Sequence, residues 1–328
     1  MKIGIAYDLR SEYLAMGFSE DETAEFDRDD TIVAIENTLQ ALGHQTERIG
    51  HLKQLAAALT AGKRWDLVFN IAEGMYGIGR EAQVPALLDG FRIPYTFSDP
   101  LVMSLTLHKG MTKAVLRDAG VPTSDFLVAA TVADCAGVGF APPYFVKPVA
   151  EGTGKGITPA SIVREKAALA GRVEELLRIY QQPVLIEPYL AGREFTVGIV
   201  GTGAAAEAVG SVEVILLDKA EPGVYSYVNK ENCEELVEYR LVRATADPLV
   251  AEAEQIALQA WRVLGCRDGG RVDIRCDADQ RPLFMEVNPL AGIHPAHSDL
   301  PIICTKMGIA YQTLIKRIVD SAAQRVSG

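Results

Sequence analysis

Cysteine is scarce in this sequence and shows none of the spacings that make it structural. The five cysteines among 328 residues are an odd number, and no C-x-x-C pair occurs. A disulfide framework and a structural zinc site both need paired, regularly spaced cysteines. We therefore expect buried free thiols.

Clustered positive charge and long apolar runs are also absent. The 32 Lys and Arg residues are outnumbered by 43 Asp and Glu, which gives a net charge of −11. Nucleic acids and anionic membranes bind through clustered cations, so neither is expected as a partner. No segment approaches the roughly 18 apolar residues of a membrane span, and the apolar run 3–7 is too short for a signal peptide. We expect a cytoplasmic protein.

Two common nucleotide-binding fingerprints are missing. No G-x-G-x-x-G motif follows the first expected strand, and Lys155 is followed by glycine where a Walker A motif has serine or threonine. A Rossmann dinucleotide site and a P-loop are therefore not indicated.

Apolar material for a large core is plentiful, with 48% hydrophobic and 23% charged residues. A chain of this length forms two or three domains of roughly 100 to 150 residues. In its first part, strand-like segments 2–7 and 66–71 alternate with helix-like segments 32–42 and 81–88. This alternation predicts an α/β unit with a parallel sheet.

A glycine-rich loop follows a short apolar strand in the middle of the chain. The strand Tyr144–Pro148 carries Lys147 and leads into Ala150–Gly156, where every second residue from Gly152 onward is glycine. Backbone N–H groups in such a loop can cradle phosphate oxygens, and Lys155 adds positive charge. A flexible hairpin explains the loop equally well, so other segments must decide.

Beyond this loop, residue periodicity predicts further regular elements. Helices are expected at 165–179 and 248–264, and strands at 183–190, 194–200 and 207–217. The second helix has Asp247 as its N-cap, proline in the first position and Gly265 as its stop.

The segments 271–276 and 284–288 alternate charged and apolar residues, which is typical of half-buried strands. The turn-forming run 277–280 between them predicts a hairpin that sets Asp273 opposite Glu286 and Arg271 opposite Asn288. Opposed carboxylates repel unless a cation lies between them, and oxygen ligands suit Mg²⁺, whose other positions are filled by water and phosphates. The alternative is a solvated strand pair neutralised by Arg271 and Arg275.

Five motifs taken in order carry a resemblance to a known family: 145–148, 151–156, 187–197, 270–273 and 285–288. Together they resemble the ATP-grasp superfamily, and within it the D-alanine:D-alanine ligases. The resemblance implies an N-terminal open parallel α/β domain at 1–102, a central α+β lid domain at 103–190 and a C-terminal α+β domain with an antiparallel sheet at 191–328. ATP would lie between the last two domains.

The resemblance also implies the chemistry. ATP and Mg²⁺ would phosphorylate a carboxylate to an acyl phosphate, which an amine attacks to form a C–N bond, with release of ADP and phosphate. The expected substrates are amino acids or short peptides, and the expected assembly is a homodimer. Two alternatives stay open: a D-alanine:D-alanine ligase itself, and an ATP-binding protein without catalysis.

Matched residue by residue, the resemblance implies a full site. Nucleotide or phosphate contacts fall on Lys109, Lys147, Glu151, Gly152, Thr153, Gly154 and Lys230. Glu187, Tyr189 and Leu190 would face adenine, and Glu194 the ribose. Metal ligands would be Asp273, Glu286 and Asn288. Catalytic roles fall on Arg271, Lys230 and Thr153, and substrate contacts on Gly292, His297 and Ser298.

Departures from the family cluster on the amino-acid side. Thr153 replaces the serine of the phosphate loop, and Glu231 stands where a tyrosine is expected. If the acidic segment 20–30 also folds over this pocket and is not a solvated loop, added negative charge favours a larger or basic amino acid, or a peptide end, over D-alanine. His294 and His297 could instead be a zinc pair, which would need further ligands.

Overall fold

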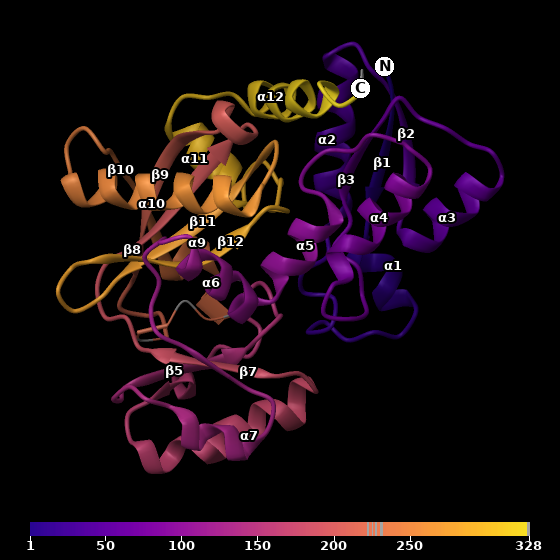
Figure 1. Cartoon of the computed structure of the whole chain (residues 1–328). Helices are drawn as coiled ribbons and strands as arrows, with labels where there is room; N and C mark the ends of the chain where they lie inside the picture. Colours follow the sequence, from indigo (N-terminus) through magenta and orange to yellow (C-terminus); the bar gives the residue numbers. More distant parts are fainter. Residues whose placement is uncertain (222, 225, 227, 230–231, 327–328) are drawn as a thin grey trace.

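The computed structural model describes residues 1–221, 223–224, 226, 228–229 and 232–326. Three separate sheets lie in successive parts of the chain (Figure 1). No helix among these residues is both long and apolar enough to cross a membrane.

The N-terminal unit is a parallel sheet in the order β2-β1-β3, as the alternation of elements predicted. Its strands are β1 (Lys2–Tyr7), β2 (Gln45–Gly50) and β3 (Leu67–Ile71). Its helices are α1 (Arg10–Ala15), α2 (Asp29–Ala41), α3 (Leu52–Thr60), α4 (Gln83–Gly90) and α5 (Pro100–Leu107). Every residue of β3 is buried, which explains its unbroken apolar sequence.

The central unit is an antiparallel sheet in the order β4-β7-β5-β6, covered by one helix. The strands are β4 (Leu127–Ala129), β5 (Tyr144–Pro148), β6 (Ile162–Val163) and β7 (Val184–Pro188). The helices of this part of the chain are α6 (Lys109–Asp118) and α7 (Leu169–Tyr180). Val173 and Leu176 of α7 pack on the sheet, so the helix spacing seen in the sequence forms a core.

The C-terminal unit is a five-stranded antiparallel sheet in the order β10-β9-β8-β11-β12. The strands are β8 (Glu194–Val200), β9 (Glu207–Leu216), β10 (Val237–Val242), β11 (Gly269–Cys276) and β12 (Pro282–Asn288). The helices are α9 (Cys233–Leu236), α10 (Pro248–Leu264), α11 (Asp299–Lys306) and α12 (Tyr311–Ala323). The Asp247 side chain accepts the Leu249 N–H, and Gly265 ends α10 in the left-handed conformation, as predicted.

The C-terminal helix joins the first and last units. In Figure 1, α12 runs from the five-stranded sheet back to α2, and it packs against α2 and β3. Leu314, Ile315 and Ile318 share one buried core with Ile3 and Ile35. The sequence pattern had not predicted α5, α11 or α12, and the continuous core holds the N-terminal unit against the five-stranded sheet.

Candidate active site

The hairpin of β11 and β12 has the predicted register. Asp273 lies opposite Glu286 and Arg271 opposite Asn288, although a bulge follows Asp273. Alternation buries Val272 and Ile274 under α10, so the charged face turns the other way. The two carboxylates are therefore set side by side at the edge of a rigid sheet.

Cations already surround this pair of carboxylates. Arg271 forms an ion pair with Asp273, and its Nε lies 3.2 Å from Oδ2 of Asp299. Burial acts to lower the pKa of Arg271, but the nearby carboxylates hold it above its ordinary value. Glu286 lies 3.6 Å from Nζ of Lys109. The alternative interpretation, in which Arg271 and Arg275 neutralise the two carboxylates, therefore holds for Arg271 only. Arg275 pairs with Glu194 at 3.0 Å.

A buried network holds Lys147 in place. Oε1 of Glu187 lies 3.1 Å from Nζ of Lys147, and Oε2 lies 2.8 Å from Nζ of Lys113. Burial would raise the pKa of Glu187, but the two ammonium groups lower it to about 2. Sequence analysis missed Lys113, which is fully buried and carries no motif.

A small cavity of about 60 Å³ opens beside this network. It brings together half of the expected nucleotide and metal residues: Lys147, Glu187, Tyr189, Leu190, Glu194, Asp273 and Glu286. The Tyr189 hydroxyl donates to the carbonyl oxygen of Gly223 at 3.0 Å, and Arg275 stacks 5.4 Å above its ring. The wall is therefore partly aromatic and partly charged, which suits a nucleoside.

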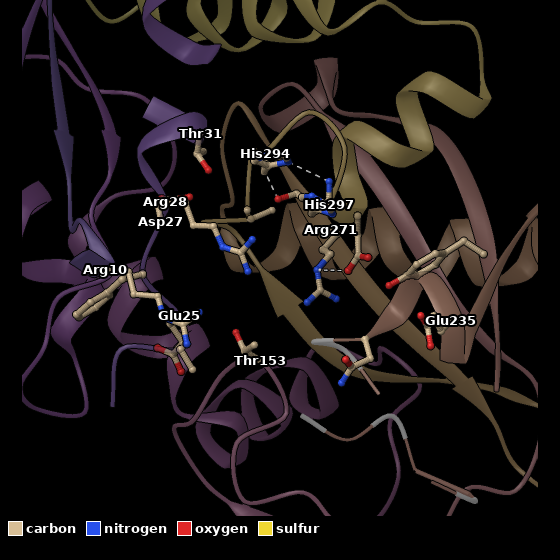
Figure 2. A pocket seen from close by; sticks show the side chains of 18 residues that line it. Arg10, Glu25, Asp27, Arg28, Thr31, Thr153, Glu235, Arg271, His294 and His297 are labelled. Carbon is tan, nitrogen blue, oxygen red and sulfur yellow. Dashed lines mark hydrogen bonds and ion pairs between the residues drawn. The ribbon is translucent and has the colours of Figure 1, made fainter. Parts of the chain in front are cut away.

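The glycine loop lies across the next, larger cavity. Nζ of Lys109 donates to the carbonyl oxygen of Glu151 at 2.6 Å, while the Glu151 carboxylate pairs with Lys155 at 2.7 Å. Thr153 and Gly154 both have a positive φ, of 51° and 74°. Thr153 faces the cavity (Figure 2). The ammonium group of Lys155 is therefore paired with a carboxylate of the same loop.

Glu25 ties the N-terminal unit to this loop. Its Oε1 accepts the Gly152 N–H at 2.8 Å, and its Oε2 lies 2.7 Å from the guanidinium of Arg80. Arg80 in turn donates to the carbonyl oxygen of Ala150 at 2.9 Å. The acidic segment that contains Glu25 therefore does fold over the same pocket, which the sequence had raised only as a possibility.

The larger cavity, of about 490 Å³, lies between the N-terminal unit, the glycine loop, β11 and the loop before α11 (Figure 2). It collects five more of the expected residues: Thr153, Arg271, Gly292, His297 and Ser298. It also contains Arg10, Arg28 and Asp27, which sequence analysis had not singled out as site residues. Two cavities thus meet at Arg271 and Asp273, one lined for a nucleotide and one for a polar substrate.

The histidines of the last loop shape the loop itself. Nδ1 of His294 accepts the N–H groups of Ala296 and His297 at 3.1 Å, and its Nε2 lies 3.3 Å from Asp30. Burial lowers the pKa of His294, so the neutral ring donates from Nε2. Within the described part of the chain no group of three or more His, Cys, Asp and Glu side chains could hold a metal. Among the described residues, the alternative of a zinc site at His294 and His297 therefore finds no third ligand.

Of the remaining expected residues, Lys109, Glu151, Gly152, Gly154 and Asn288 lie outside both cavity linings. Lys230, and Glu231 beside it, lie outside the described residues. Four of the five cysteines are recorded as free thiols: Cys135, Cys266, Cys276 and Cys304.

Comparisons with known proteins agree with this geometry. Residues 116–320 match the family described as D-ala D-ala ligase C-terminus. The chain is 35% identical over 283 residues to the D-alanine–D-alanine ligase of Bordetella petrii, covering 84% of this chain and 80% of that one.

Solved structures show the same fold. The D-alanine–D-alanine ligase of Bacillus anthracis superposes over 100% of this chain and 99% of its own, with a TM-score of 0.76 and 22% identity. The same enzyme complexed with ATP gives a TM-score of 0.73 at equal coverage and identity. The chain therefore belongs to the D-alanine–D-alanine ligase family of ATP-grasp enzymes, which are ATP-dependent ligases that form a C–N bond.

Proposed function

We propose that this protein joins two molecules of D-alanine through an acyl phosphate. The observation that carries the proposal is the 35% identity, over most of both chains, to a D-alanine–D-alanine ligase. A second relative with that name, from Cupriavidus pinatubonensis, is 30% identical over 87% of this chain. These relatives support the narrower of the two ligase hypotheses better than a general amino-acid or peptide ligase.

In the proposed reaction, a carboxylate oxygen of the first D-alanine attacks the γ-phosphorus of ATP, and ADP leaves. The amino nitrogen of the second D-alanine then attacks the acyl carbon. Phosphate departs with the electrons of the C–O bond, and the amine proton passes to solvent. Arg271, fixed by Asp273 and Asp299, would stabilise the negative charge that develops on the acyl oxygen.

The small cavity would hold the nucleotide. Tyr189 and Leu190 would contact adenine, Glu194 the ribose, and Lys147, held by Glu187, the phosphates. Lys109 would contact the phosphates itself. It would also hold the carbonyl of Glu151 and so place the loop Gly152–Gly154 over the phosphates. Lys230 stays a proposed phosphate and catalytic residue on family resemblance alone.

Mg²⁺ fits the hairpin. Asp273 and Glu286 supply opposed carboxylates, and the buried side-chain nitrogen of Asn288 has no hydrogen-bond partner in the described part of the chain. Because no described residue holds that nitrogen, the amide can turn its oxygen toward a cation. Two carboxylates and an amide are a hard oxygen set suited to Mg²⁺. Bound there, the ion would neutralise charge on the transferring phosphate.

The larger cavity would hold both amino acids. Ser298 accepts the backbone N–H of His294 at 2.9 Å, which leaves its own hydroxyl proton for a substrate carboxylate. Gly292 and His297 line the same wall, and Thr153 closes the cavity from the loop side. The domain boundaries 1–102, 103–190 and 191–328 and the homodimer remain part of this proposal; α5 runs across the first boundary.

ADP release measured with Mg-ATP and D-alanine, together with mass spectrometry of the product, tests the proposal. We expect D-alanyl-D-alanine and equal amounts of ADP and phosphate, with little turnover on L-alanine. A protein that binds ATP but releases no ADP with any amino acid would instead be a non-catalytic nucleotide-binding protein.

A further inference from the structure

Arg28 contributes a positive charge to the larger cavity that the proposed reaction leaves unused. It precedes the first residue of α2, and its side chain does not cap that helix. Figure 2 shows its guanidinium directed into the cavity on the side that faces Arg271. Among the described residues, no carboxylate forms an ion pair with Arg28.

The acidic neighbours of Arg28 are held by other groups. Asp29 lies 3.2 Å from Arg48, and Asp30 lies 3.3 Å from His294. Burial, opposed by a hydrogen bond from Thr31, raises the pKa of Asp27 to about 7, so this carboxyl is partly protonated at neutral pH. Burial would raise the pKa of Asp30, but the hydrogen bond from His294 and the charge of Arg28 lower it, so Asp30 is ionised, although it forms its close contact with His294 and not with Arg28.

A second guanidinium lies on the same side of the cavity. Arg10 of α1 pairs with Glu20 at 2.6 Å, but its Nε is buried without a hydrogen-bond partner in the part of the chain that the structure describes. A buried N–H left without a partner is costly, so a ligand that accepts from it would be favoured.

The carboxylates of the cavity are mostly engaged. Glu25 is held by Arg80 and the Gly152 N–H, and Asp299 by Arg271. Glu235 is exposed and lies on the opposite wall (Figure 2). The sequence had suggested that the acidic segment favours a basic substrate, but the structure turns that segment's arginine, and not a free carboxylate, into the cavity.

Two alanines present only one free carboxylate to the protein, since the other becomes the acyl phosphate. Ser298, Gly292 and His297 already line the wall proposed for it. We infer that one of the two amino-acid sites accepts, besides D-alanine, a substrate with an additional anionic group, such as the side-chain carboxylate of an acidic amino acid, and that Arg28, supported by Arg10, binds this group. The inference rests on the proposed amino-acid ligation and names its substrate class.

An isosteric pair of substrates tests the inference. D-Aspartate and D-asparagine are each offered with D-alanine and Mg-ATP, and kcat/KM is measured by phosphate release with mass spectrometry of the mixed dipeptide. A charge-assisted hydrogen bond is stronger than a neutral one, so wild type should prefer D-aspartate by about tenfold or more. D-Glutamate and D-glutamine, one methylene longer, repeat the comparison.

The variants separate Arg28 from general effects on the helix. Arg28→Ala should lower the aspartate-to-asparagine ratio by about tenfold or more, and Arg28→Lys should restore part of it. Asn37→Ala is the control, because Asn37 is exposed on the same helix, does not line the cavity and should leave the ratio unchanged.

Each outcome decides. The inference is overturned if kcat/KM is equal for the acid and its amide in both substrate pairs, or if Arg28→Ala leaves their ratio unchanged. D-Alanine ligation stands in either case. A loss of turnover in Arg28→Ala that is the same for every substrate also overturns the inference, since Arg28 would then contact the transferring phosphate. If no amino acid supports phosphate release, the proposed function itself fails.

Discussion

Lys113 and Glu187 form a buried ion pair, with 2.8 Å between Nζ and Oε2, behind the wall of the nucleotide cavity. The Lys113 ammonium also donates to the hydroxyls of Thr123 and Ser124, at 3.0 and 2.9 Å. Lys147 holds the other oxygen of the same carboxylate. Lys113, which lines neither cavity, therefore positions the Glu187 carboxylate, and this carboxylate orients Lys147, which is proposed to contact phosphate.

Lys113→Met should destabilise the protein and weaken ATP binding. Removing one partner of a buried ion pair costs about 3 to 5 kcal/mol; because Lys147 still pairs with Glu187, we expect the lower end. Urea unfolding and ATP titration measure the two effects. The control Lys316→Met removes an exposed pair with Asp320 and should cost less than about 1 kcal/mol. Wild-type ATP affinity in Lys113→Met would refute the positioning role.

Glu286→Gln should lower kcat by about 100-fold or more with the melting temperature almost unchanged, because it removes one charge from the proposed Mg²⁺ site. The dependence of turnover on Mg²⁺ concentration should shift to higher concentrations. Glu238→Gln, at an exposed position on β10, serves as the control. Wild-type turnover in Glu286→Gln would rule out the metal hypothesis.

Arg271→Lys should lower kcat far more than ATP affinity, since an ammonium cannot reproduce a planar fork of donors. Calorimetric ATP binding and steady-state kinetics separate the two. Arg275→Lys is the matched comparison, because Arg275 lines the nucleotide cavity and pairs with Glu194. It should affect ATP affinity first. The reverse pattern would make Arg271 a nucleotide or structural residue.

Gly292→Ala should raise KM for the amino acids and leave ATP binding intact. A Cβ at this position would lie 2.7 Å from Oγ of Ser298, so the proposed carboxylate-binding hydroxyl must move. An increase of about tenfold corresponds to the loss of one good hydrogen bond, about 1.4 kcal/mol. Gly171→Ala, in α7 with open space around it, should be harmless or stabilising. An unchanged KM would exclude Ser298 from substrate binding.

Asp27 should make stability depend on pH. Its pKa is raised in the folded protein to about 7, whereas an unfolded aspartate titrates near about 3.9. Between these values the folded state binds more protons than the unfolded state, so this residue's contribution to stability falls as pH rises from about 4 to about 7 and is constant above.

Asp27→Asn removes this effect. Relative to wild type, its free energy of unfolding should gain about 1 to 3 kcal/mol between pH 4.5 and pH 8, discounted for partial exposure. Unfolding curves at several pH values measure the difference in free energy of unfolding between the variant and wild type. The contributions of all other titrating groups cancel in this difference. A constant difference would show that Asp27 is ionised at its ordinary pKa in the fold.

Part of the site could be predicted from sequence because it depends on short-range regularities. The period of two in β11 and β12, with a turn between them, sets Asp273 opposite Glu286 without knowledge of the rest of the fold. The capping of α10 by Asp247 is local in the same way. The helices α11 and α12 were not predicted, although they complete the core that joins the first and last units.

The sequence by itself determined the type of the strongly periodic elements, the facing carboxylates and, by resemblance, the order of the nucleotide-binding motifs. Only the tertiary structure decided which charges meet. Glu25 reaches Gly152 across 127 positions of the chain, and Lys113 reaches Glu187 through the core. Arg28 lines the cavity, while its acidic neighbours Asp29 and Asp30 lie beside Arg48 and His294. Periodicity reports which face of an element is buried, but the partner of a buried or half-buried charge depends on how separate elements pack, and no local pattern encodes that.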